Sequence, residues 1–165
     1  MTILTHETET PAGMLRTASR DGVLVACGFA DHWDGLVARI VERFPDDDWT
    51  DGESDASRSV DAYVGGDLTA IDDLPVDTGG TEFQERVWAA LRTIPLGETW
   101  SYGELAAAVG NEGAMRAVGS ANGKNPVSVV VPCHRVVRAD GSLGGYGGGL
   151  DRKAWLLAHE GARLA

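Results

Sequence analysis

The residues with the clearest potential for chemistry lie together at Pro132-Cys133-His134-Arg135. The cysteine follows a rigid proline and precedes two potential cations, and such surroundings can stabilise a thiolate, the nucleophilic form of cysteine. His134 is a candidate acceptor for the thiol proton. Because neighbours in an extended chain point to opposite faces, we expect this proton to move through a bridging water. A structural cysteine beside a surface histidine is the alternative that these four residues leave open.

A glycine-rich loop and a carboxylate follow the cysteine. Residues 143–150 contain five glycines around Tyr146, without the Gly-Lys-Ser/Thr ending of a phosphate-binding loop. Glycines let a backbone approach a flat ligand while the tyrosine ring stacks on it, although a flexible connector has the same composition. Glu160 would fix the tautomer of His134 if the two side chains met, and would otherwise be a solvated surface residue.

The first half of the chain predicts a small α/β unit. Two alternating segments at 15–19 and 23–29 flank an Asp-Gly turn and predict a hairpin. Apolar residues at helical spacing from Trp33 to Phe44 predict a helix that packs on this short antiparallel sheet. Residues 46–59 are acidic and polar and predict a solvated loop, with a short helix around 60–64.

The second half predicts mainly helices. Capping boxes at Thr81–Gln84 and Ser101–Glu104 begin two of them, the first ending at Pro95, and a further helix is expected from about 113 to 121. The last two are short and joined by a glycine-containing turn, which is the pattern of a helix-turn-helix and also of any antiparallel helix pair. A final helix capped by Asp151 is expected before Gly161.

The helix predicted over 113–121 carries one long, positively charged side chain, Arg116. Small side chains surround it: Ala114, Ala117, Ser120 and Ala121. Small side chains allow tight packing against another helix. They also allow a helix backbone to press into a narrow groove of DNA, with the arginine inserted into it. Both interpretations stay open at this point.

The fold class that these elements predict is α+β, with an N-terminal α/β domain at 1–75, a linker at 76–80 and a helical domain at 81–165. Residues 1–80 carry 17 acidic and 5 basic side chains, whereas residues 81–165 carry 8 and 9. Nearly all of the net charge of -11 therefore belongs to the first half. The net charge of the whole chain argues against a phosphate-rich partner, but the near-neutral charge of the second half does not.

Composition excludes several classes of protein. The 165 residues are 43% hydrophobic and 24% charged, which is typical of globular proteins and not of disordered, collagen-like or fibrous chains. No apolar run approaches the roughly 18 residues of a membrane helix, and no signal peptide is evident, so we expect a cytoplasmic location. We expect no disulfide, with Cys27 a buried hydrophobe, and no metal, because the four histidines lack zinc-ligand spacing.

Residues 81–165 resemble the O6-alkylguanine-DNA alkyltransferase family without a gap, whereas residues 1–80 resemble it loosely. The motifs that carry the resemblance are Arg116-Ala117-Val118-Gly119, Asn125-Pro126, Val131-Pro132-Cys133-His134-Arg135-Val136-Val137, Gly145-Tyr146-Gly147-Gly148-Gly149-Leu150 and Trp155-Leu156-Leu157-Ala158-His159-Glu160-Gly161. The family implies direct, irreversible repair of O6-alkylguanine, and of O4-alkylthymine, in duplex DNA. It implies a monomer that acts once, without a cofactor. No metal is implied, because the zinc ligands of the human enzyme's N-terminal domain have no counterparts here.

The resemblance also implies roles for catalytic residues. Cys133 would accept the alkyl group, His134 would take the thiol proton through water, and Glu160 would orient His134. Asn125 would brace the turn before the active site, and Tyr102 would bear on the phosphate and the N3 atom of the target nucleotide.

For DNA, the family implies a helix-turn-helix in the minor groove and a lesion flipped out of the duplex. Arg116 would replace the lesion in the base stack, with Ala114, Ala117, Ser120, Ala121 and Arg135 as further DNA-binding residues. The flipped base would meet Tyr146, Gly147, Val136 and Asn122. Two of these depart from relatives: Gly147 replaces a serine found in several members, and Asn122 replaces a methionine of the human enzyme, which bears on tolerance for bulky alkyl groups.

Two other functions compete with alkyl transfer. In a lesion sensor or transcriptional regulator, the DNA-binding helices would matter and Cys133 would be structural. In a thiol hydrolase, Cys133 and His134 would turn over small esters or peptides, and Arg116 would have no purpose. The presence of Cys133 favours the reactive alternative over the sensor.

Overall fold

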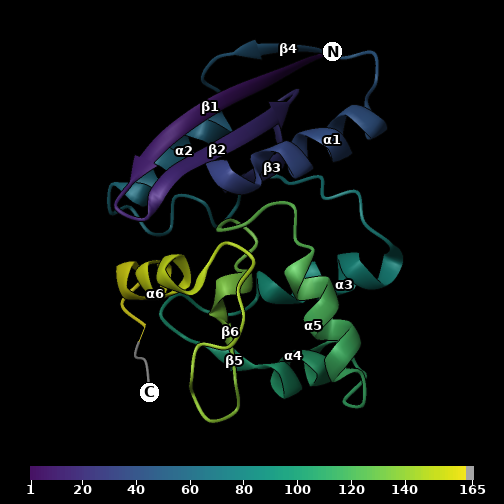
Figure 1. The fold of residues 1–165 in the computed structure, drawn as a ribbon, viewed down its shortest axis with the longest axis vertical. Helices are drawn as coiled ribbons and strands as arrows, with labels where there is room; N and C mark the ends of the chain where they lie inside the picture. The colour runs from purple at the N-terminus through teal and green to yellow at the C-terminus, as the bar shows by residue number, and fades with distance from the viewer. Residues whose placement is uncertain (163–165) are drawn as a thin grey trace. The chain divides into compact units, whose positions relative to one another are not determined.

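The structure is a computed structural model that describes residues 1–162, and its chain forms two compact units, Met1–Thr78 and Gly79–Ala165 (Figure 1). It confirms the α+β class. The boundaries predicted at 1–75, 76–80 and 81–165 stay predictions. Within the part of the chain that the structure describes, no helix combines the length and hydropathy that crossing a membrane requires.

The first unit is built on a four-stranded sheet with the order β3-β2-β1-β4. Its strands are β1 (Thr2–Thr10), β2 (Gly13–Arg20), β3 (Val23–Phe29) and β4 (Asp48–Asp51). The predicted hairpin is confirmed as β2 and β3, and both turn residues, Asp21 and Gly22, have the positive φ that a tight hairpin turn requires. β1 pairs antiparallel with β2 and parallel with β4.

The two helices of this unit are α1 (Trp33–Arg43) and α2 (Asp55–Val64). Ile3 of β1 belongs to the apolar core with Trp33 and Ile40 of α1. His6 and Thr8 bond instead to Asp61 of α2. Because side chains alternate along a strand, α1 and α2 cover opposite faces of the sheet.

The prediction of a solvated loop over 46–59 is wrong, because this segment contains β4 and the first residues of α2. β4 is a polar edge strand that main-chain pairing with β1 holds in place, so it carries no apolar pattern. The start of α2 is set by a capping box at Ser54, which extends the predicted short helix toward the N-terminus.

The second unit contains α3 (Glu82–Leu91), β5 (Trp100–Ser101), α4 (Tyr102–Ala108), α5 (Met115–Gly123), a one-turn 3-10 helix (Cys133–Arg135), β6 (Val136–Val137) and α6 (Leu150–His159). Strands β5 and β6 pair in parallel. Helices α3, α4 and α5 pack on one another, and the indole of Trp88 in α3 donates a 2.8 Å hydrogen bond to the carbonyl of Ala121 in α5.

Both predicted capping boxes are confirmed, at the starts of α3 and α4. The start of α6 differs from its prediction. Its N-cap is Gly149, whose φ of 100° is in the left-handed region that favours glycine, and Asp151 lies in the first helical turn. The helix therefore begins where the glycine loop ends, two residues earlier than a cap at Asp151 would place it.

The cap of α3 gives a test of local stability. In Thr81→Ala, the amide of Gln84 loses the hydroxyl that accepts its hydrogen bond. Loss of such a cap costs about 1 kcal/mol of unfolding free energy. Chemical denaturation of the full chain should show this loss, and the exposed control Thr69→Ala should show almost none. Equal stability of the two variants would contradict the capping geometry.

Candidate active site

Cys133 begins the one-turn 3-10 helix and is only 5% exposed. The extended backbone expected at Cys133 and His134 is wrong, because both residues lie in this helical turn. The amide of Val131 bonds to the carbonyl of Val127, and Val129 has a φ of 74°, so residues 127–131 form a tight turn. In this segment, local hydrogen bonds outweigh the strand preference of the β-branched residues.

Asn125 closes this turn with both ends of its amide. Its Oδ1 accepts a 3.0 Å hydrogen bond from the amide of Val127, and its Nδ2 donates a 2.7 Å bond to the carbonyl of Val131. The side chain is buried, so these bonds are shielded from water. Asn125 thus fixes the backbone that delivers Cys133.

The sulfur lies in an apolar setting with a few polar neighbours. Burial raises the pKa of Cys133, while hydrogen bonds from Asn125, Ser128 and Tyr146 and the charge of Lys153 lower it in part. The balance is a raised pKa, so the resting group at neutral pH is a thiol and not the stabilised thiolate that the sequence suggested. A reaction at this sulfur therefore needs a base.

His134 and Glu160 meet, as predicted. The imidazole is fully buried, and its Nε2 lies 3.0 Å from Oε2 of Glu160. Neither ring nitrogen makes a hydrogen bond of good geometry within residues 1–162, but Nε2 is committed to this contact with the carboxylate, whereas Nδ1 contacts no such group. Nδ1 is therefore the nitrogen with free capacity to take a proton.

Arg135 holds the far side of the same carboxylate. Its Nε donates to Oε1 of Glu160 at 2.9 Å, its Nη2 to Oε2 at 3.0 Å, and its Nη1 to the carbonyl of Ile94 at 2.8 Å. Arg135 is buried and its guanidinium is engaged inside the unit, so the structure gives it a structural role, while its contact with DNA stays a prediction.

Glu160 is ionised at neutral pH despite its burial. Burial alone would raise its pKa, but the hydrogen bonds and charges of His134 and Arg135 lower the pKa to about 2. One anion therefore lies between two potential cations, and it orients His134 by charge as well as by hydrogen bonding.

Lys153 is a site residue that sequence reasoning missed. It is fully buried, and its Nζ donates to the carbonyls of Val136 at 2.6 Å and Gly145 at 3.2 Å. Burial lowers its pKa to about 8, although the charge of Cys133 acts the other way. Lys153 lies three and four positions before the buried Leu156 and Leu157, and this helical spacing could have identified it.

Aromatic side chains close the site. The ring of Tyr146 lies over Gly148, where a Cβ atom would be only 2.7 Å from the ring, so this position requires glycine. Tyr102 packs beside Gly119 of α5, and both its burial and the charge of Cys133 raise its pKa. The two tyrosines thus approach Cys133 from different elements.

The remaining predicted pocket residues are placed as follows. Val136 and Asn122 are buried, and Gly147 is exposed in the loop before α6. Nδ2 of Asn122 donates a long 3.4 Å hydrogen bond to the carbonyl of Cys133. The carbonyls of Cys133 and Val136 therefore already accept bonds from Asn122 and Lys153, and each keeps a second lone pair for a ligand.

Helix α5 presents part of its small-residue face to solvent. Arg116, Ala117 and Ser120 are exposed, and Ala114 is half-buried. Ala121 is buried, and its carbonyl accepts the hydrogen bond from the indole of Trp88, so its contact with DNA stays a prediction. Tight packing therefore explains the small residues at Gly119 and Ala121. The small residues at Ala117 and Ser120 instead form an open surface beside Arg116.

Comparison with known proteins matches residues 82–162 to the family model of the 6-O-methylguanine DNA methyltransferase, DNA binding domain. A methylated-DNA–protein-cysteine methyltransferase of Mycolicibacterium paratuberculosis is 48% identical over 92% of this chain and 88% of its own length. One of the same name from Shigella flexneri is 58% identical over 62% of this chain, which spans 60% of that protein.

Solved structures resemble both units. The O6-methylguanine methyltransferase of Mycobacterium tuberculosis matches 99% of this chain and 95% of its own with a TM-score of 0.79 and 39% identity. The OGT of the same organism in complex with DNA matches 98% of this chain and 93% of its own with a TM-score of 0.78 and 41% identity.

The buried network predicts a pH-dependent loss of stability in Glu160→Gln. The variant leaves the Arg135 guanidinium buried without its counter-charge, which costs about 3 to 5 kcal/mol of unfolding free energy at neutral pH. Because the carboxyl pKa is about 2 in the fold against 4.5 ordinarily, this stabilisation is present above 4.5 and is lost as the pH falls toward 2.

Denaturant unfolding from acidic to neutral pH measures this effect. The gap between wild type and variant should be largest at neutral pH and should narrow in acid. The matched control is Glu112→Gln, since Glu112 is exposed. A gap no larger than that of the control at neutral pH would contradict the network.

Proposed function

Because the chain belongs to the O6-methylguanine-DNA methyltransferase family, we propose that it repairs O6-alkylguanine in duplex DNA by transferring the alkyl group to Cys133. This is the activity of a methylated-DNA–[protein]-cysteine S-methyltransferase. The observation that carries the proposal is a buried thiol with a raised pKa next to a buried His134-Glu160 pair. A purely structural cysteine needs no such base.

The reaction is a displacement at the alkyl carbon. The thiol of Cys133 gives its proton to Nδ1 of His134 through water, since Nε2 is held by Glu160. The sulfur then forms a bond to the alkyl carbon as the bond from that carbon to guanine O6 breaks. The departing guanine takes up one proton, so atoms and charge balance without a cofactor.

The product explains why each molecule would act once. The product at Cys133 is a thioether, and its alkylated sulfur can no longer form the nucleophilic thiolate. Asn125 and Ser128 position the sulfur, and the Glu160 carboxylate stabilises His134 once it is protonated. The same chemistry serves O4-alkylthymine, whose alkyl oxygen is also attached to an aromatic ring.

Recognition of DNA would fall to the exposed part of α5 in the second unit. Arg116, Ala117 and Ser120 form a surface with one long cation among small side chains, as entry into the minor groove requires. Arg116 would fill the space of a base flipped toward Cys133, where Tyr146 would stack on it. Tyr102 would contact the target nucleotide, while Gly147, Asn122 and the Val136 carbonyl would border the base.

Helices α4 and α5 would act as the helix-turn-helix of this interface. The near-neutral charge of residues 81–165 implies that shape and base flipping contribute more than phosphate attraction. We also propose that the protein acts as a monomer in the cytoplasm, where a DNA repair protein meets its substrate.

The alkyl acceptor is tested by intact mass. After incubation with a duplex that contains one O6-methylguanine, wild type and Cys27→Ala should each gain one methyl group, located on the peptide of Cys133. Cys133→Ser should gain none and should leave the lesion in the DNA. Binding of the lesion duplex without any gain of mass by wild type would support a lesion sensor instead.

Base flipping is tested by comparing two substrates. Arg116→Ala should slow methyl transfer from duplex DNA by about 10- to 100-fold, because flipping costs a few kcal/mol that the inserted side chain offsets. Its reaction with free O6-benzylguanine, which needs no flipping, should stay near the wild-type rate. Lys124→Ala removes a nearby positive charge and serves as the control. Equal losses on both substrates would contradict the role of Arg116.

A further inference from the structure

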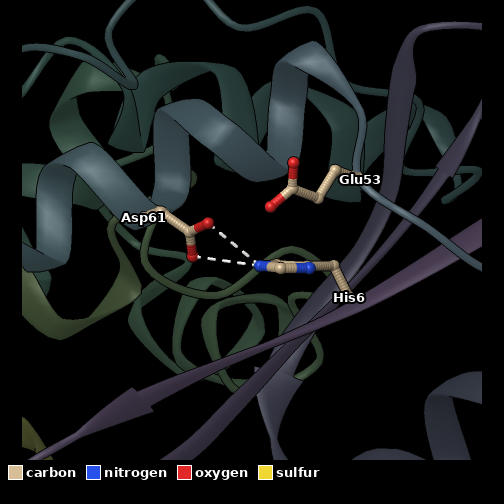
Figure 2. A group of neighbouring side chains, drawn as sticks. All are labelled: His6, Glu53 and Asp61. Atoms are coloured by element: carbon tan, nitrogen blue, oxygen red, sulfur yellow. Dashed lines mark hydrogen bonds and ion pairs between the residues drawn. The ribbon is translucent and has the colours of Figure 1, made fainter.

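The first unit holds a cluster of three side chains that the proposed repair reaction does not use. Figure 2 shows His6 of β1, Asp61 of α2 and Glu53, just before α2, directed into one space. One ligand atom from each residue lies within 4.8 Å of the other two. His6 Nε2 is 2.9 Å from one carboxylate oxygen of Asp61 and 3.2 Å from the other.

The charges of this cluster favour a cation. Two carboxylates converge on one imidazole, and like charges at this separation repel each other. Among the ion pairs of residues 1–162, none joins Asp61 to a lysine or an arginine. The guanidinium of Arg58 is 3.5 Å from Glu53 and is shared with Asp55 at 3.0 Å. The unit as a whole is also strongly acidic.

We propose that His6, Glu53 and Asp61 bind a divalent first-row transition metal ion of the zinc class. An imidazole nitrogen with two carboxylate oxygens is a donor set that such ions accept, whereas calcium and magnesium take oxygen ligands. Zinc bonds of about 2.0 to 2.2 Å place neighbouring ligand atoms about 3 to 3.5 Å apart. His6 Nε2 and Oδ1 of Asp61, 3.2 Å apart, already have this separation, and a rotation of the exposed Glu53 side chain would bring in the third ligand.

The surroundings hold two of the ligands in place before an ion binds. The hydroxyl of Thr8 donates to Oδ1 of Asp61 and so restricts the rotation of that carboxylate. Ser54, which follows Glu53, caps α2 and bonds through its hydroxyl to Ser19 of β2 at 3.0 Å. Partners of this kind orient ligands in metal sites. A bound ion would join β1 to α2 and stabilise this unit.

The alternative is a simple ion pair between protonated His6 and Asp61, with Glu53 solvated. The two explanations differ at Glu53, because an ion pair does not need it and a metal site does. Its side chain is about half exposed and forms a long ion pair with the exposed Arg58, so E53Q should fold normally. This variant therefore gives the sharpest test, and H6Q and D61N extend it.

Metal binding is measured on the full chain after chelation, with Zn²⁺ by calorimetry and with Co²⁺ by visible absorption, near neutral pH. Wild type should bind one ion per chain, and Zn²⁺ should raise its thermal midpoint. E53Q, H6Q and D61N should each lose at least about tenfold in affinity for the metal. Substituting residues that only hydrogen-bond to metal ligands already costs about this much, and these three residues would be the ligands themselves. The cobalt spectrum should show no thiolate band, since Cys27 and Cys133 are outside the cluster.

The matched control is H32Q. His32 also lies beside an aspartate, Asp31 at 3.9 Å, without being part of the three-residue cluster. It should keep wild-type affinity. R58Q should bind Zn²⁺ at least as tightly as wild type, because it removes a competing cation from Glu53. No stoichiometric binding by wild type, unchanged affinity in E53Q, or weaker binding in R58Q would each overturn the proposal.

Discussion

The ion pair between Glu160 and Arg135 is the interaction on which the catalytic half depends. It joins the C-cap of α6 to the 3-10 turn that begins at Cys133, two elements 25 residues apart. It keeps the carboxyl group ionised inside the protein, where burial alone would neutralise it. The same carboxylate orients His134, so the ion pair provides both structural support and an aligned base for the thiol.

This arrangement explains why the cysteine can be both stable and reactive. Burial keeps Cys133 as a thiol and protects it from oxidation and from chance electrophiles, since reactivity follows thiolate character and exposure. In a protein that acts once, oxidation or chance alkylation of Cys133 would end its activity before it bound a lesion.

Sequence reasoning predicted the elements whose signals are local. The capping boxes at Thr81 and Ser101, the Asp-Gly hairpin and the meeting of His134 with Glu160 are all present. The motifs that resemble a known family supplied the last of these, because no spacing rule links residues 26 positions apart.

The errors arose where distant parts of the chain decide the structure. β4 has no apolar pattern and exists because its backbone pairs with β1. The burial of Arg135 and Lys153 is not evident from the sequence, because the partners that make it tolerable, Glu160 and two backbone carbonyls, are contributed by other segments. The turn before Cys133 is set by the two hydrogen bonds of the Asn125 side chain, which the β-branched sequence of residues 127–131 does not indicate.

The measurement that tests the central claim most directly is the pH dependence of single-turnover methyl transfer in wild type and His134→Gln. If a buried thiol relies on His134 to lose its proton, wild type should react well at neutral pH. The variant should react slowly there and should approach the wild-type rate as the pH rises toward the raised pKa of Cys133. Parallel pH profiles for the two proteins would contradict this account.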